Sequence, residues 1–157
     1  MRKKIIFITI AIACCLLAGS IGAFATQSSV NTWYTTLNKP SFNPPNWIFA
    51  PVWTTLYLLM GIAAGRVWSN GFHHKWVKTA MYHFIFQLLL NTLWSLVFFG
   101  LQQVFGALIV IICLLTLLLF TFKWFKIVDK LAAYLLIPYI IWVSFALVLN
   151  FSIWQLN

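Results

Sequence analysis

The chain has 157 residues, of which 63 % are apolar and only 7 % are charged, and its net charge is +9. Soluble domains carry about 45–50 % apolar and about 25 % charged residues, so this composition excludes a soluble enzyme or a disordered chain and indicates a protein embedded in a bilayer. Asp129 is the single acidic residue, which excludes paired-carboxylate catalysis and carboxylate-held Ca²⁺ or Mg²⁺ sites.

Five apolar runs are each long enough to cross a hydrocarbon core of about 30 Å as a helix. Backbone groups inside lipid must pair within their own segment, so these runs should be helical. The sequence therefore predicts one all-α membrane domain, residues 1–157, built as a bundle of five transmembrane helices with a long, ordered first loop. The expected helices cover residues 5–25, 49–67, 81–101, 104–122 and 131–153.

The first run follows three basic residues and ends near Ala23-Phe24-Ala25, which is also the pattern of a cleaved signal peptide with small residues at its cleavage site. The run is long for a signal peptide, however. It also carries Ala18, Gly22 and Thr26 at a helical spacing that suits close packing against neighbouring helices. We expect the run to be retained as the first transmembrane helix.

The loop at residues 27–48 is long and rich in aromatic residues, with Trp33, Tyr34 and Trp47. Three prolines between residues 40 and 45 make it stiff and extended. A long loop in a compact chain is usually functional, often as a lid. The alternative is a disordered external linker, but the large aromatic side chains favour a packed lid.

In the second run, Trp53, Tyr57, Gly61 and Gly65 repeat every four residues and share one helix face. Gly61 and Gly65 form a GxxxG pattern, which brings helices into close contact. The pattern leaves open whether that contact lies inside the chain or between two subunits.

In the third run, Gln87, Asn91 and Trp94 lie on one face, with His83 one turn earlier. Amides that face lipid are unfavourable, so this face should look into the bundle. Spacing alone does not decide between hydrogen bonding among helices and a ligand pocket. His83 has no second ligand at a recognisable metal spacing, so we expect a structural histidine and no metal site.

The third and fourth runs are joined only by residues 102–103, which predicts antiparallel neighbours. The fourth run has no polar stripe and is expected to face lipid or a second subunit. In the fifth run, Pro138, Trp142, Ala146 and Asn150 repeat every four residues and should form another inward face. Pro138 also predicts a kink.

The basic residues predict the orientation in the membrane. Nine of the ten Lys and Arg residues flank one side of the predicted bundle, and only Lys39 lies on the other. Cytoplasmic loops carry the excess of basic residues, so the N-terminus should lie inside and the C-terminus outside. Because these basic residues lie next to the spans, we expect them to contact lipid headgroups and not nucleic acid. The nine are Arg2, Lys3 and Lys4 before the first run, Arg66, Lys75 and Lys78 in one loop, and Lys123, Lys126 and Lys130 in another.

The three cysteines, Cys14, Cys15 and Cys113, all lie within apolar runs and form no C-x-x-C pattern. We expect them to be unpaired and buried as small hydrophobic residues.

Several of these motifs occur together in a known family. The string Trp33-Tyr34-Thr35-Thr36-Leu37-Asn38-Lys39-Pro40, the Pro44-Pro45 pair, and Phe49-Ala50-Pro51-Val52-Trp53-Thr54 resemble the first loop and second helix of the TspO/MBR family. Gln87 to Ser95 resembles its third-helix motif, and Pro138 to Asn150 its fifth-helix motif. The family comprises the tryptophan-rich sensory proteins and the mitochondrial translocator protein, also known as the peripheral benzodiazepine receptor.

The resemblance implies a five-helix bundle, often a homodimer, in what is expected to be a bacterial cell membrane. It implies an internal pocket that binds porphyrins, such as protoporphyrin IX and haem, as well as isoquinoline and benzodiazepine-type ligands, with no required cofactor. Light-dependent porphyrin degradation is also implied, with Trp53 and Trp142 as the photochemical residues. Alternatives are transport of porphyrin or other lipophilic molecules, and a purely structural subunit. The ligand-binding residues implied by the family are Tyr34, Pro44, Phe49, Trp53, Tyr57, Asn91, Trp94, Tyr139, Trp142 and Ala146.

The chain departs from the mammalian relatives at the end of the fifth run. There, a cholesterol motif carries a tyrosine and a basic residue, whereas this chain has Phe151 and Gln155. We therefore expect weak cholesterol binding.

Overall fold

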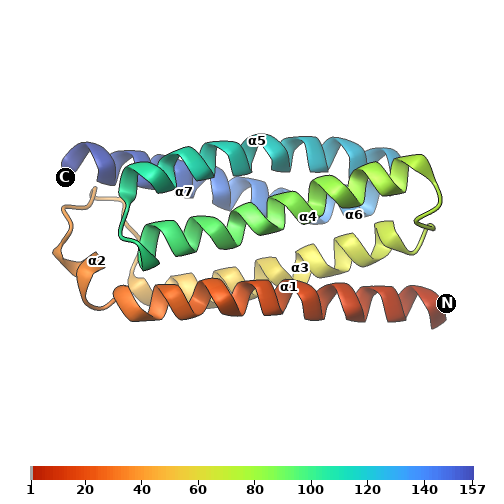
Figure 1. Ribbon diagram of the computed structural model, residues 1–157, viewed down its shortest axis with the longest axis horizontal. Helices are drawn as coiled ribbons and strands as arrows, with labels where there is room; N and C mark the ends of the chain where they lie inside the picture. The colour runs from red at the N-terminus through yellow and green to blue at the C-terminus, as the bar shows by residue number, and fades with distance from the viewer. Residues whose placement is uncertain (1) are drawn as a thin grey trace.

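The computed structural model describes residues 2–157 as a bundle of five long helices (Figure 1). Each is long and apolar enough to cross a membrane, so the predicted all-α architecture is confirmed. The long helices are α1 (Arg2–Ser29), α3 (Phe49–Trp68), α4 (Lys75–Ser95), α5 (Val104–Val128) and the consecutive pair α6 (Lys130–Leu135) and α7 (Ile137–Leu156). Three short elements complete the chain: helix α2 (Trp33–Thr36), the 3-10 turn η1 (Asn46–Ile48) and the π-helical turn η2 (Leu96–Gly100).

Helices α4, α5 and α6 extend beyond the predicted apolar runs and Arg66 lies within α3, so the expectation that six basic residues lie in loops is wrong. A helix can continue past the apolar core because long basic side chains cover apolar surface while their charged ends reach water. The six residues lie near the ends of helices: Arg66 in α3, Lys75 and Lys78 in α4, Lys123 and Lys126 in α5, and Lys130 in α6.

The predicted kink before Pro138 is confirmed. Helix α6 ends at Leu135 and α7 begins at Ile137, with the Leu136 N–H donating to the Ala133 carbonyl at 3.0 Å. The expectation that Pro138 shares the inward face is wrong, because its side chain is exposed. A step of four residues exceeds the 3.6-residue helical turn, so such a series rotates around the helix as it lengthens.

The two glycines of the GxxxG pattern bring α3 against α1, which settles the alternative left open by the sequence in favour of contact within the chain. A methyl group on Gly61 would lie 2.5 Å from the Ile12 Cα, and one on Gly65 would collide with the backbone of Ile8. These approaches are possible only because neither glycine has a side chain. Helices α1 and α3 are therefore antiparallel neighbours in contact (Figure 1).

Helices α4 and α5 form the predicted antiparallel hairpin (Figure 1). Their connection after η2 is only three residues long, and Gln102 within it has a φ of 56°. Helix α5 packs on α4 and α7 with one face, and its other face is exposed. Cys15 is buried, whereas Cys14 and Cys113 are exposed, so the expectation that all three are buried is wrong. An apolar residue in a membrane helix can face lipid as well as the interior.

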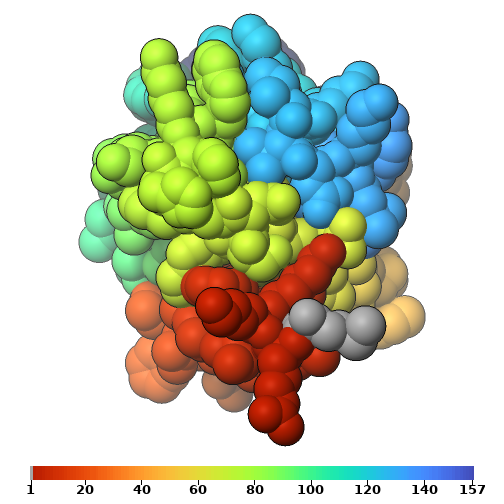
Figure 2. Space-filling model, turned by 90° about the vertical axis from the view of Figure 1, so that its right-hand side faces the viewer, coloured from red at the N-terminus to blue at the C-terminus, as the bar shows by residue number. Residues whose placement is uncertain are grey.

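The single acidic residue lies at the end of the bundle that carries the N-terminus. Asp129 forms an ion pair with Arg66, with a nitrogen-to-oxygen distance of 2.9 Å. Its other carboxylate oxygen accepts from the Ala132 N–H at 3.1 Å and caps α6. Figure 2 shows this end, where the start of α1, the α3–α4 connection and the α5–α6 junction meet.

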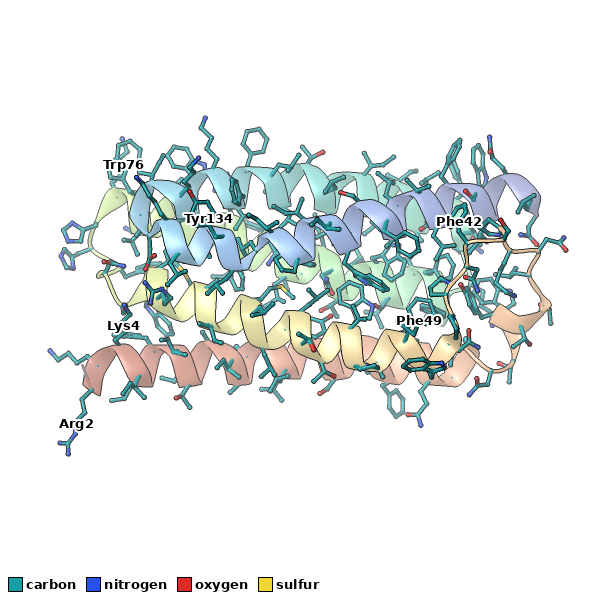
Figure 3. All side chains as sticks on the ribbon, turned by 180° about the vertical axis from the view of Figure 1, so that it is seen from behind. Arg2, Lys4, Phe42, Phe49, Trp76 and Tyr134 are labelled. Carbon is teal, nitrogen blue, oxygen red and sulfur yellow. The ribbon has the colours of Figure 1, made fainter. Side chains whose placement is uncertain are left out.

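The first loop is ordered and covers the opposite end of the bundle, beside the C-terminus (Figure 1). Tyr34 is 1 % exposed, and its hydroxyl donates to Asn43 Oδ1 at 2.6 Å. Asn38 and Asn157 join the loop to the end of α7, because the Asn38 N–H donates to Asn157 Oδ1 at 3.0 Å and Asn157 Nδ2 donates to the Asn38 carbonyl at 2.9 Å. Figure 3 shows Phe42 and Phe49 at this end and Arg2 and Lys4 at the other.

Candidate ligand-binding site

A cluster of aromatic rings surrounds Trp53 in the half of the bundle nearest the first loop. The Trp53 ring lies 5.7 Å from that of Tyr57, 6.5 Å from Trp94, 6.3 Å from Tyr139 and 6.4 Å from Trp142, measured between centroids. Such separations are typical of favourable aromatic packing. Helices α3, α4 and α7 thus bring together five of the residues predicted to form the site.

Phe49 extends this cluster to the first loop. Its ring centroid lies 6.2 Å from that of Tyr34 and 6.3 Å from that of Trp142, both in edge-to-face geometry. The first loop is therefore packed directly on the predicted site, as expected of a lid.

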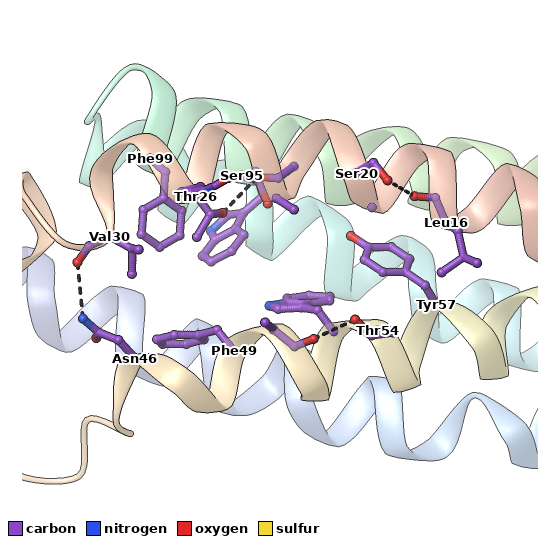
Figure 4. Close-up of a pocket in the computed structure, with 17 residues that line it drawn as sticks. Leu16, Ser20, Thr26, Val30, Asn46, Phe49, Thr54, Tyr57, Ser95 and Phe99 are labelled. Atoms are coloured by element: carbon purple, nitrogen blue, oxygen red, sulfur yellow. Dashed lines mark hydrogen bonds between the residues drawn. The ribbon is translucent and has the colours of Figure 1, made fainter.

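A cavity of about 440 Å³ lies between α1, α3 and the end of α4 (Figure 4). Its volume falls within the range of small-molecule sites, about 300–1,000 Å³. Four predicted site residues line it: Phe49, Trp53, Tyr57 and Trp94. We call this space the side cavity.

A second, much smaller space of about 20 Å³ lies on the α7 side of Trp53, where Tyr34, Trp142 and Ala146 contribute to its lining. That volume holds about one water molecule, so a larger ligand requires side chains to move. Phe49, Trp53 and Trp94 border both spaces. The predicted pocket is thus divided by aromatic rings into an open part and a closed part.

The indole nitrogen of Trp142 is buried and donates to no acceptor among residues 2–157. A buried donor without a partner is unfavourable by about 1–3 kcal/mol. Trp142 can therefore offer a hydrogen bond to any carbonyl or carboxylate that enters the closed part of the pocket.

Asn91 lies at the centre of a buried hydrogen-bond network that joins α3, α4 and α7. The Tyr57 hydroxyl donates to Asn91 Oδ1 at 2.6 Å, and Asn91 Nδ2 donates to the Tyr139 hydroxyl at 2.8 Å. Tyr139 in turn donates to Gln87 Oε1 at 2.8 Å. The inward orientation of this helix face is confirmed, since Gln87, Asn91 and Trp94 are all buried. Asn91 and Tyr139 line neither space, so their contact with a ligand stays a prediction.

The other predicted loop residue, Pro44, is half-buried and lines neither space; its carbonyl accepts from Asn43 Nδ2 at 3.2 Å. Tyr34, by contrast, is enclosed by the loop. Burial raises the pKa of Tyr34 to about 12, so its hydroxyl stays protonated and keeps donating to Asn43 at neutral pH.

The sequence reasoning missed the contribution of α1 to the site. Gly19, Gly22, Ala23 and Thr26 line the side cavity, and the sequence had indicated only that small residues of this run pack closely. Ser95 and Phe99, which lie one residue and five residues after Trp94, were also missed. The signal available in the sequence was the cluster of small side chains on one face of the first run.

His83 lies outside the site. Its Nδ1 donates to the Thr79 carbonyl at 2.8 Å, and its ring packs near Phe120 and Trp124. Within residues 2–157, no group of three or more His, Cys, Asp or Glu side chains is placed to hold a metal ion.

Five apolar helices around an aromatic-walled cavity define a multi-pass membrane protein with an internal pocket. The sequence pattern of the TspO/MBR family matches residues 11–155. The chain is 43 % identical over 157 residues to tryptophan-rich protein TspO of Chlorobaculum tepidum, with 100 % of this chain and 99 % of the relative covered. It is 46 % identical over 143 residues to tryptophan-rich protein TspO of Archaeoglobus fulgidus (90 % and 91 % covered), and 38 % identical over 148 residues to the human translocator protein (90 % and 86 % covered). The chain therefore belongs to the TspO/MBR family.

Proposed function

We propose that this protein is a membrane receptor that binds porphyrins, with protoporphyrin IX and haem as the leading ligands. The observation that carries the proposal is the side cavity of about 440 Å³, walled by Phe49, Trp53 and Tyr57. A flat macrocycle gains most from flat aromatic walls, because its faces can stack on them. Isoquinoline and benzodiazepine-type ligands also present aromatic rings that can pack on these walls. No cofactor is required for such binding.

The polar groups of the cavity also suit a porphyrin. No charged side chain of the described residues lines it, whereas the amides of Gln27 and Asn46 lie among the lining residues. A macrocycle lying among the aromatic rings can direct its carboxylate groups to these amides. A relative in Cereibacter sphaeroides, 37 % identical over 155 residues, is named tryptophan-rich sensory protein, which supports a sensory role.

The direct test is titration of the purified protein with protoporphyrin IX in darkness. Trp53→Ala removes one of the rings that border both parts of the pocket and is expected to weaken binding at least tenfold. Trp124→Ala is the matched control, because Trp124 stacks on Trp76 near the N-terminal end of the bundle and should bind as the wild type does. Absence of saturable binding by the wild-type protein would reject the proposal.

Light-dependent degradation of the bound porphyrin is the second candidate function. It is favoured by the Trp53–Trp142 pair, whose rings are 6.4 Å apart, because indole is readily oxidised. Transport is the remaining alternative, and flux of porphyrin into sealed liposomes distinguishes it from binding alone.

We further propose that the protein acts as a homodimer in a bacterial cell membrane, with the first loop and the C-terminus outside. Its sterol affinity is expected to be weak.

A further inference from the structure

We infer that the ligand enters the side cavity from within the bilayer, through a lateral gap between α1 and α3 on the first-loop side, and not past the first loop. The inference rests on the proposed function, since it concerns the route by which the porphyrin reaches its site. It assigns a role to α1, which the family resemblance did not include in the pocket.

The gap begins beyond the close contacts that Gly61 and Gly65 make with α1. Gly61 and Gly65 hold α3 directly against Ile12 and Ile8 of α1 in the half nearest the N-terminus. Because the two helices are antiparallel, each step of four residues forward along α1 pairs with a step of four residues back along α3. Extending this pairing of α1 with α3 toward the first loop places Ala23 opposite Ala50. The two helices thus meet closely in one half and border the cavity in the other.

The cavity reaches the lipid-facing surface through this second half. Among its lining residues, Ser20 and Ala23 of α1 and Ala50 and Thr54 of α3 are exposed. All four side chains are small. An opening bordered by exposed residues of two membrane helices faces lipid and not water.

Two glycines of α1 let this helix pack closely against the inner wall of the cavity. A methyl group on Gly22 would lie 3.0 Å from the Ser95 Oγ, and one on Gly19 would lie 2.5 Å from the Tyr57 ring. Larger side chains at these two positions would occupy the space between α1 and the aromatic wall. Their absence brings the α1 backbone directly against Tyr57 and Ser95, which form the inner wall of the cavity.

The first-loop end of the cavity is closed by contacts on the loop. Asn46 Nδ2 donates to the Val30 carbonyl at 3.3 Å and joins the start of α3 to the end of α1 (Figure 4). Beyond it, Lys39 Nζ donates to the carbonyls of Tyr34 and Leu37 at 2.8 and 2.9 Å, and Asn157 holds Asn38. A route through the loop requires these bonds to break, whereas the lateral route requires none of them to break.

The chemistry of the gap fits a molecule dissolved in lipid. The hydroxyls of Ser20 and Thr54 both donate to carbonyls of their own helices, at 2.8 Å in each case. They present neither a charge nor a free donor to the membrane. The flat macrocycle of a porphyrin can therefore pass between them without stripping water from a charged group of the protein.

The test measures association and dissociation rates of protoporphyrin IX, with the protein in vesicles and the porphyrin supplied in the same lipid. Ala23→Trp and Ala50→Trp each narrow the gap from one side, and either is expected to slow association at least tenfold, with dissociation slowed as well. Ile21→Trp is the matched control, because Ile21 is 55 % exposed on the same helix outside the cavity lining, and it should leave both rates unchanged. Asn157→Ala, which loosens the loop, should not speed association.

The outcomes of this experiment distinguish failure of the lateral entry route from failure of the proposed porphyrin binding. Failure of the wild-type protein to bind at equilibrium would remove the proposed function itself. Saturable wild-type binding with unchanged rates in both gap variants would reject only the lateral route. Faster association in Asn157→Ala would likewise reject the lateral route, in favour of entry past the loop.

Discussion

The indole ring of Trp53 separates the open part of the pocket from the closed part, and it contacts the rings of α4 and α7. A porphyrin in the side cavity would stack on Trp53 directly. Trp142 lies behind it, at 6.4 Å and almost perpendicular, with an interplanar angle of 88°. The two tryptophans are therefore expected to contribute unequally to any photochemistry, with Trp53 the more important.

Trp53→Phe and Trp142→Phe are expected to keep most of the porphyrin affinity, because a ring remains, and to slow the illuminated loss of bound porphyrin. The reason is that phenylalanine is much harder to oxidise than tryptophan. The measurement is the rate of porphyrin loss and the product spectrum at matched absorbance, with Trp124→Phe as the remote control. Equal rates and identical products in every variant and in detergent-dissolved porphyrin would leave the protein as a binder only.

Asn91→Leu is expected to weaken porphyrin binding by about 1–3 kcal/mol, the range for a buried hydrogen-bonding group that loses its partner. The substitution removes the acceptor of the Tyr57 hydroxyl, and Tyr57 lines the side cavity. Asn70→Leu, in the exposed α3–α4 connection, is the control. The dissociation constant and the thermal midpoint are measured together. A folded Asn91→Leu protein with normal affinity would limit Asn91 to helix packing.

At the scale of the elements, the contact between α1 and α3 depends on the absence of two side chains. Gly65→Ala should destabilise the protein by about 1–3 kcal/mol, the usual range for overpacking a tight contact, because its methyl group meets the Ile8 backbone. Gly100→Ala is the matched control, since the nearest atom to its methyl group is the Ala25 Cβ at 3.9 Å. Unfolding in detergent measures both. Equal stability of the two variants would show that α1 and α3 do not rely on this contact.

The first loop is expected to lose stability in alkali. Burial raises the pKa of Tyr34 from 10.0 to about 12, so the native state binds the phenol proton more tightly than the unfolded state does. The stabilisation is complete below pH 10 and is lost as the pH rises from 10 to about 12. The thermal midpoint should therefore fall over this interval in the wild type and fall less in Tyr34→Phe. The same slope in both proteins would contradict the assignment to Tyr34.

The sequence predicted the elements better than the spaces between them. Hydropathy reports which segments match the bilayer, and the burial of Gln87 and Asn91 follows from the unfavourable exposure of amides to lipid. The side cavity could not be predicted in this way, because it arises where Gly19 and Gly22 face Tyr57 and Ser95 on other helices. Periodicity tells which face of a helix points inward, but the distance to the opposite helix depends on the partner. For the same reason, the GxxxG pattern predicted a close helix contact but did not identify α1 as the partner.

For the molecule as a whole, the distribution of charge predicts the orientation in the membrane. Nine of the ten basic residues lie toward one end, and Lys39 lies in the loop at the other. A reporter fused after Asn157 is therefore expected to be external, and one fused before Arg2 internal. Protease accessibility of the two fusions in sealed cells measures this. An internal signal from the C-terminal fusion would contradict the orientation.

The connection between α4 and α5 has a consequence for biosynthesis. Its three residues, Leu101 to Gln103, span about 10 Å when fully extended, a third of a hydrocarbon core of about 30 Å. With so short a connection, α4 and α5 cannot be inserted into the membrane separately, so the pair must enter the bilayer as a single hairpin during synthesis. Helix α5 has no basic residue near its start, so its orientation in the membrane is determined by that of α4.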